Sequence, residues 1–222
     1  MTTVVIGDNT GNDFAGTEDT HMKSNSATTN YATTDPIEST KYGVGDHTHA
    51  LLKFSGLSNI TPTVTVSSAT LSFYNVVADN GYSGGTTQTI SARRLLRNWD
   101  VATATWNVYS TGNSWTTAGG LSDGNDRVAA ASATVTGNST NDAAYKSFSG
   151  ATMASDTEGF INGTLSNYGW HFERTDNQND TYFWTWSSED HASGQRPYLT
   201  VVYTTSGGGT TTNFLTLLGV GT

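Results

Sequence analysis

The chain has 222 residues and a net charge of −9, with 35% hydrophobic, 11% aromatic and only 13% charged residues. The acidic balance argues against nucleic acid or an anionic membrane as partner, because both attract Lys and Arg. There is no cysteine, which excludes disulfides and thiolate metal sites. No run approaches the ~18 apolar residues of a membrane-spanning helix. We therefore expect neither a nucleic-acid partner nor a membrane partner.

Short apolar–polar alternations between turns rich in Gly, Asn, Asp and Thr are typical of an all-β fold. The run VTVSSATLSFYNVV at 64–77 alternates most clearly. The predicted strands, in chain order, are residues 4–6, 21–26, 50–54, 64–77, 88–96, 128–136, 168–173, 182–187 and 198–203.

One short helix is predicted over 156–162. Ser155 is its N-cap, Asp156 and Glu158 lie in its first turn, and Gly163 follows its end. Together the elements predict an antiparallel two-sheet sandwich of the jelly-roll type with one short helix, spanning residues 1–203.

The end of the chain has a different composition. Residues 204–212 (TTSGGGTTT) predict a flexible Gly/Thr linker, and residues 213–222 form an apolar peptide. We expect this peptide to dock on a protein partner or on another copy of the chain. A disordered tail or an expression artefact are the alternatives. The predicted docking side chains are Phe214, Leu215, Leu217, Leu218 and Val220.

Five segments, in order along the chain, carry a resemblance to a known family. They are ALLKFSGLSNI at 50–60, VSSATLSFYNV at 66–76, RRLLRNWDVATATWN at 93–107, FINGTLSNYGWHF at 160–172 and WSSEDHASGQRPYLTVVY at 186–203. In these the chain resembles the DNRLRE-type jelly-roll family, which includes the family 96 carbohydrate-binding modules. The resemblance implies a non-catalytic β-sandwich, similar to polysaccharide-binding modules of secreted bacterial proteins and to domains of phage virion proteins.

Aromatic residues are the candidates for stacking on sugar rings. Trp115 is predicted to face solvent from a loop, and Tyr82 from the Gly-rich loop at 78–86. Trp184 shares a strand face with Trp186, and that face is either an exposed platform or core. Trp99 and Trp106 are interpreted mainly as core residues or loop anchors.

Two turns rich in Asp and Asn could supply the oxygen ligands that calcium prefers. Asp123 and Asp126 lie in SDGND, and Asp176 and Asp180 lie in TDNQND, although ordinary turns use the same residues. The sequence requires no cofactor, with calcium as the one possible ion. The pair of histidines in DHTH at 46–49 could bind a transition metal from one strand face, but a polar loop is the preferred interpretation.

Catalytic signatures are absent from the sequence. The GxSxG pattern occurs at 81–85 and 120–124, but both matches lie in predicted loops and not between a strand and a helix, so we expect no nucleophile elbow. There is no phosphate-binding loop or dinucleotide fingerprint. Glu173, Glu189 and Asp190 are candidates for a glycosidase pair only because they are acidic. For Glu189 we expect instead a structural pair with Arg196. The sequence predicts a protein without enzymatic activity.

These observations favour a structural or adhesive binding protein. The first hypothesis is a phage virion component, either a capsid decoration or a tail-associated subunit, attached through its terminal segments and assembled in the host cytoplasm. The second is an extracellular carbohydrate-binding module that recognises a polysaccharide. A polysaccharide hydrolase or lyase is the third.

Overall fold

The computed structural model describes residues 1–42, 45–76, 87–137, 143–175, 183–192 and 194–205. Tyr82, Asp176, Asp180 and the peptide at 213–222 lie outside these ranges, so their predicted roles remain predictions. The strands and helices are β1 (Thr2–Gly7), β2 (Thr17–Lys23), η1 (Ser24–Ser26), β3 (Ile37–Tyr42), β4 (Asp46–Phe54), η2 (Ser55–Asn59), β5 (Val64–Asn75), β6 (Gln88–Arg94), β7 (Val108–Ser110), β8 (Asn113–Ser114), β9 (Ala133–Gly137), β10 (Ala144–Ser149), α1 (Ala151–Ile161), β11 (Trp170–Arg174), β12 (Phe183–Trp186) and β13 (Tyr198–Thr205).

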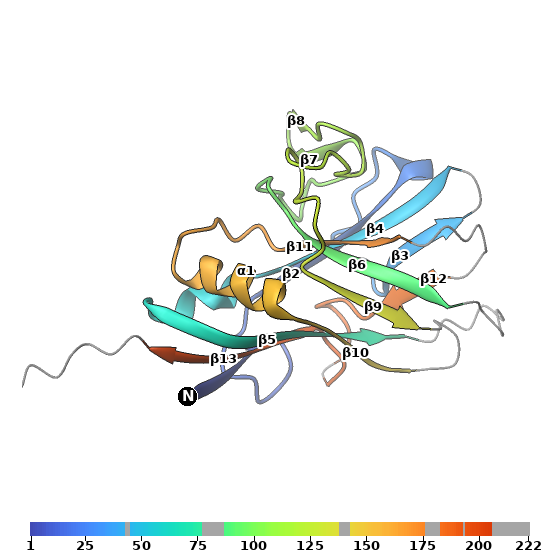
Figure 1. The fold of residues 1–222 in the computed structure, drawn as a ribbon. Helices are drawn as coiled ribbons and strands as arrows, with labels where there is room; N and C mark the ends of the chain where they lie inside the picture. The colour runs from blue at the N-terminus through green and yellow to red at the C-terminus, as the bar shows by residue number, and fades with distance from the viewer. Residues whose placement is uncertain (43–44, 77–86, 138–142, 176–182, 193, 206–222) are drawn as a thin grey trace, which may run out of the picture.

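The long strands form an antiparallel sandwich of two layers (Figure 1). One layer contains β1, β13, β5 and β10, and the other contains β12, β3, β4, β11, β6 and β9, with β2 paired to β4. Among the described residues, the pair of Trp186 and Asn75 connects the two layers into one ladder. The predicted all-β sandwich is confirmed.

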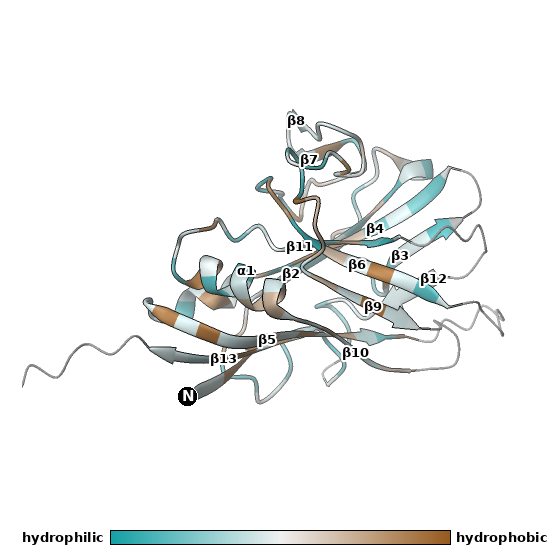
Figure 2. Ribbon diagram, in the orientation of Figure 1, coloured by the Kyte–Doolittle hydropathy of each residue, from teal (hydrophilic) through white to brown (hydrophobic). Residues whose placement is uncertain are grey.

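The longest strand, β5, shows how sequence alternation produces the inner face. Ala69, Leu71 and Phe73 are buried, as are Val64 and Val66, so the buried positions change parity between 66 and 69. The register between β5 and β13 shifts at the same place, as it does at a β-bulge. The bulge keeps apolar side chains inside along the strand, whose ribbon alternates between apolar and polar bands in Figure 2.

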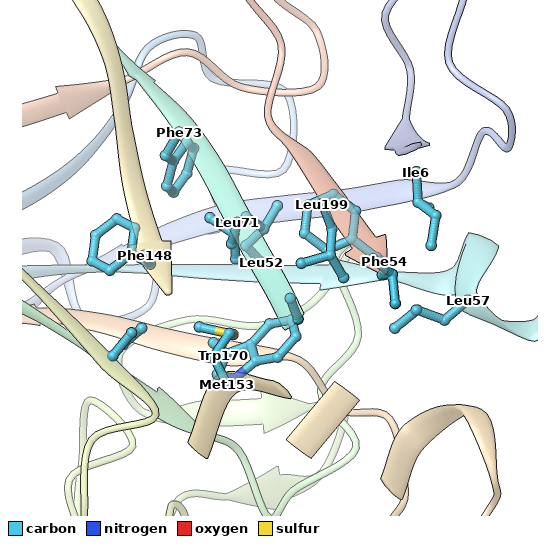
Figure 3. Close-up of a cluster of buried hydrophobic side chains, with 14 of the residues drawn as sticks. Ile6, Leu52, Phe54, Leu57, Leu71, Phe73, Phe148, Met153, Trp170 and Leu199 are labelled. Atoms are coloured by element: carbon cyan, nitrogen blue, oxygen red, sulfur yellow. The ribbon is translucent and has the colours of Figure 1, made fainter. Parts of the chain in front are cut away.

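The core lies between the layers. Figure 3 shows Leu71 and Phe73 of β5 with Phe148 of β10 on one side, and Trp170 of β11 with Met153 of α1 on the other. All five side chains are fully buried. Large rings supply much of this apolar area, which explains how a chain with 35% hydrophobic residues sustains a core.

The helix is longer than predicted. It begins at Ala151 rather than at Asp156, after Gly150, and ends at Ile161. Asp156 is buried and forms an ion pair with Arg94 (2.9 Å), while Glu158 accepts a hydrogen bond from the backbone N–H of Val66 (2.8 Å). The acidic residues that suggested a helix start therefore join the helix to β6 and β5.

Other elements also differ from the prediction. Strand β2 covers Thr17–Lys23 rather than 21–26, and β9 covers Ala133–Gly137 rather than 128–136. Residues 37–42 and 144–149 form β3 and β10, where no strand was predicted, because their residues are mostly polar. Strand β13 continues to Thr205, so the first two residues of the predicted linker belong to the sandwich. Within the described ranges, no helix has the length and apolar character needed to cross a membrane.

Candidate functional site

The segment from residue 95 to 132 builds a second hydrophobic cluster on the outside of the layer that contains β4 and β11. In Figure 1 this segment, with β7 and β8, rises above that layer. The cluster joins Met22 of β2 and Leu51 of β4 to side chains of the segment. Its buried members from the segment are Leu95, Trp99, Ala104, Trp106 and Trp115.

The predicted exposure of Trp115 is wrong. Only 4% of the residue is exposed, its Nε1–H donates to the carbonyl of Thr105 (2.9 Å), and its ring packs edge-on against Tyr109. The segment is not an open loop, since it has its own apolar cluster, and the ring is a core residue of that cluster. Trp115 therefore has no free face for a sugar ring.

Of the two alternatives left open for the face of β12 that Trp184 shares with Trp186, the structure shows the core and not the exposed platform. Trp184 is fully buried in the main core and stacks on Trp186, with ring centroids 5.1 Å apart. Both rings point into the space between the layers. The shared face predicted for them is correct, but it is the inner face of the sandwich.

The carboxylate of Asp126 accepts its hydrogen bonds from other groups of the same chain. The residue is fully buried, and its oxygens accept hydrogen bonds from N–H groups rather than facing an open site. These donors are the backbone N–H groups of Thr116, Thr117 and Ser122 and the Nε of Arg97. Burial raises the pKa of this carboxyl group, but the hydrogen bonds from Thr117, Thr116 and Ser122 outweigh burial and lower the pKa.

Asp123 and Asp126 thus do not form the predicted calcium site. Asp123 is half exposed and forms an ion pair with Arg127 (3.0 Å). Among the described residues, no group of three or more His, Asp or Glu side chains is arranged to hold a metal ion. The SDGND segment acts as a structural turn.

Two histidines meet beneath the 95–132 segment. The Nε2 of His171, on β11, lies 3.1 Å from the Nδ1 of His49, on β4. The carbonyl oxygen of Gly119 lies 3.0 Å from the first nitrogen and 3.4 Å from the second. Both histidines are buried, so these contacts replace hydrogen bonds to water.

Charged residues extend this polar network. The Nη1 of Arg127 lies 3.2 Å from the Nδ1 of His171 and 2.7 Å from the Oε2 of Glu173. The other carboxylate oxygen of Glu173 lies 2.8 Å from the Nε of Arg93. Arg127 and Glu173 are both buried. Such a network is expensive to bury unless its charges are paired, and paired buried charges with perturbed histidines are typical of functional sites.

Both histidines are neutral at pH 7. Burial lowers the pKa of His49 to about 4, although Glu173 opposes the shift. Burial also lowers the pKa of His171 well below 6.5, and the neighbouring His49 and Arg127 lower it further. The network therefore carries its positive charge on the arginines and not on the imidazoles.

Gly119 brings the 95–132 segment close to the histidines. Its φ is +81°, and a Cβ atom there would lie 2.7 Å from the Cη2 of Trp106, so only glycine fits without displacing the ring. Trp106 in turn packs on His49 (ring centroids 5.0 Å apart) and stacks on His47. The Gly119 carbonyl and the Trp106 ring together orient the side chain of His49 on β4.

A pocket of about 160 Å³ opens beside this network. We call it the β4–β11 pocket. Its lining combines imidazole rings, charged groups, a hydroxyl and one apolar side chain. The lining residues are Lys41, His47, His49, Leu121, Glu173, Arg174 and Thr175. Within the described chain, no carboxylate lies within ion-pair distance of the Lys41 ammonium group.

Sequence reasoning missed most of this site. The DHTH segment is part of β4 and not a polar loop, and His171, which has no metal-ligand partner nearby in sequence, contacts His49 across 122 residues. The sequence did contain one signal. His47 and His49 lie two residues apart, as residues on one strand face do, and both line the pocket.

A second polar network joins the loop at 187–196 to the N-terminal half. Buried Asp19 accepts a hydrogen bond from the backbone N–H of Glu189 (2.6 Å), and burial raises its pKa well above 3.8. Burial and then Asp190 raise the pKa of Glu189 to about 7. The predicted direct pairing of Glu189 with Arg196 is not seen, since this arginine donates to the carbonyls of His191 and Asp8.

The strands and the β4–β11 pocket define an all-β sandwich domain with a small polar pocket on the outside of one layer. A family model described as "Disaggregatase related repeat domain" matches residues 19–201. The chain belongs to this family, whose domains are carbohydrate-binding-like. This match does not confirm the finer resemblance of the sequence to the DNRLRE-type family and its family 96 modules. No curated protein matches the chain.

Proposed function

We propose that this chain is a non-catalytic carbohydrate-binding domain whose sugar site is the β4–β11 pocket. The observation that carries the proposal is the buried network of His49, His171, Arg127 and Glu173 beside an open pocket. The sandwich core is complete without this network, which lies on the outer face of its layer. If the network only stabilised the fold, well-packed apolar residues of similar volume would serve as well.

The pocket has the chemistry of a sugar site. Lys41 and Thr175 offer polar groups for hydroxyl oxygens, and the His47 ring, supported by Trp106, offers a flat surface. A volume of 160 Å³ is below the ~300–1,000 Å³ of pockets for drug-sized ligands, so the pocket suits one ring of a longer chain. The rest of a polysaccharide would lie outside it.

The same geometry supports binding without hydrolysis. A glycosidase needs two carboxyl groups on either side of the scissile bond. Glu173 is the one acidic residue among the side chains that line the pocket, and both its oxygens face guanidinium groups. It has no partner carboxylate there, and its oxygens are engaged.

Affinity electrophoresis tests the proposal. The full chain is run through native gels that contain a neutral polysaccharide (β-glucan or xylan) or an acidic one (pectin or alginate), with a gel free of polysaccharide as control. We expect retardation in at least one gel without release of reducing ends. Release of reducing ends would contradict the non-catalytic role, and unchanged mobility in every gel would contradict sugar binding.

The virion hypothesis receives less support. It depended on the apolar peptide at 213–222, which lies outside the described residues. The description of the matched family does not refer to virions. Light scattering on the full chain and on a chain that ends at Thr205 tests this alternative. Assembly of the full chain alone would favour it, and two monomers would remove self-assembly through the peptide.

A further inference from the structure

We infer that Arg127 fixes the proton positions of both buried histidines, so that His49 presents an Nε2–H donor to the β4–β11 pocket and selects a ligand oxygen that accepts a hydrogen bond. The inference deepens the proposed function and rests on it for the identity of the ligand. It concerns proton positions, which can be measured without any ligand.

The first step is the contact between Arg127 and His171. A guanidinium group can only donate hydrogen bonds, so the Nδ1 of His171, 3.2 Å from the Nη1 of Arg127, must accept. A neutral imidazole carries one proton. The proton of His171 is therefore on Nε2, which lies 3.0 Å from the carbonyl oxygen of Gly119.

The second step transfers this choice to His49. The Nε2–H of His171 also lies 3.1 Å from the Nδ1 of His49, a normal hydrogen-bond length, whereas the Nδ1 of His49 is 3.4 Å from the Gly119 oxygen. The Nε2–H of His171 therefore lies between two acceptors, the Gly119 oxygen and the Nδ1 of His49. A proton on the Nδ1 of His49 would instead direct two N–H groups, with their nitrogens 3.1 Å apart, toward the same Gly119 oxygen and would leave His49 only the longer 3.4 Å contact.

The third step places the donor. Because the Nδ1 of His49 accepts, its single proton lies on Nε2. Within the described chain, no protein group hydrogen-bonds this nitrogen, and His49 lines the β4–β11 pocket. Nε2 is thus the ring nitrogen left for a ligand. Lys41 lines the same pocket and can also only donate, so the two residues favour an acceptor such as a sugar oxygen.

Nitrogen-15 NMR of the full chain at pH 7 reads which ring nitrogen of each histidine carries the proton. Signals are assigned with single His→Gln variants. We expect Nε2–H with bare Nδ1 for both His171 and His49. Nδ1–H on either histidine in the wild-type chain would overturn the inference, and this result needs no variant to fold.

Variants test the role of Arg127 as a positioning residue. Arg127→Met removes the donor and should give mixed tautomers at His171 and His49, while Arg127→Lys should restore the wild-type pattern. Arg97→Met is the matched control, because Arg97 pairs with Asp126 in the same segment and contacts neither histidine. An unchanged pattern in Arg127→Met, or mixed tautomers in Arg97→Met as well, would refute this role.

Ligand addition separates this inference from the proposed function. The probe is the polysaccharide that retards the chain in electrophoresis, used as a short oligosaccharide. We expect the Nε2 resonance of His49 to shift while that of His21, which is buried elsewhere, does not. A shift absent from His49 despite binding would contradict its role as donor. If no saccharide binds, the proposed function fails while the measured tautomers stand.

Discussion

His171 and His49 lie on neighbouring strands with their Nε2 and Nδ1 atoms 3.1 Å apart, beneath the carbonyl of Gly119. The contact joins β11, β4 and the 95–132 segment at one point. It is polar, buried and uncharged at pH 7, because burial depresses both imidazole pKa values. The fold therefore places two neutral imidazole rings, which can hydrogen-bond, beside the β4–β11 pocket.

Replacing Gly119 tests how the 95–132 segment supports the site. Gly119→Ala should destabilise the chain by more than the ~1–2 kcal/mol cost of a left-handed alanine, since its Cβ would meet Trp106 at 2.7 Å. Gly112→Ala is the matched control, because Gly112 has a similar φ (+75°) and nothing within 4 Å of the added atom. Urea unfolding measures both free energies of unfolding. Equal losses would show that the contact with Trp106 does not matter.

The buried tryptophans should contribute to stability and not to sugar binding. Trp184→Ala should lower the free energy of unfolding by about 3–5 kcal/mol, because it leaves a cavity in the main core. Trp184→Phe should cost less and leave polysaccharide binding unchanged at temperatures where the variant is folded. Selective loss of binding in a folded Trp184→Phe chain would return this residue to the binding site.

The carboxylate of Asp126 should act as a structural acceptor and not as a calcium ligand. Asp126→Asn replaces one accepting oxygen by an NH₂ donor facing N–H groups, so we expect a loss of about 1–3 kcal/mol. Asp123→Asn, at a half-exposed position, should cost under about 1 kcal/mol. Melting temperatures in calcium and in EDTA should be equal for the wild-type chain. Calcium-dependent stabilisation that disappears in Asp126→Asn would contradict this account.

Stability should fall as pH drops from about 6.5 to 4.5. In this range unfolded histidines bind protons, while His21 (pKa about 3), His49 (about 4) and His171 in the folded chain do not. Each such histidine costs about 1.4 kcal/mol per pH unit. Glu189 and Asp19 act in the opposite direction, because their raised pKa values let the folded chain hold protons that the unfolded chain releases.

His47, whose pKa is also lowered by burial, acts in the same direction as the three buried histidines, so four histidines oppose two carboxyl groups. The free energy of unfolding should therefore fall by at least about 1.4 kcal/mol per pH unit. Glu189→Gln removes one opposing group and should make the loss with falling pH steeper. Urea unfolding at about pH 6.5, 5 and 4.5 measures both chains. Wild-type stability that rises between pH 6.5 and 5 would show that the carboxyl groups dominate.

The fold could be predicted from the sequence because its signals are local. The alternation at 64–77 and the apolar runs at 50–54 and 198–203 all became strands of the sandwich. Polar strands gave no such signal, and β3 and β10 were missed. The start of α1 was missed because Gly150 precedes it in place of a residue with a capping side chain.

The site could not be predicted in the same way, because its contacts are distant in sequence. His171 and His49 are 122 residues apart, and Arg127 contacts His171 of β11 from the 95–132 segment, 44 residues away in sequence. Aromatic residues in apparent loops also misled the prediction. Whether Trp115 is exposed depends on a second hydrophobic cluster, which only tertiary structure reveals.

The most direct test of the central claim is the affinity of pocket variants for the polysaccharide that retards the wild-type chain most strongly. Affinity electrophoresis compares the wild type with His49→Gln and Lys41→Met, using Lys23→Met as control because Lys23 pairs with Glu38 and does not line the pocket. The account predicts at least about tenfold weaker binding for both pocket variants and wild-type binding for the control. Equal retardation of all four chains would place any sugar site elsewhere, and no retardation of the wild type in any gel would contradict carbohydrate binding itself.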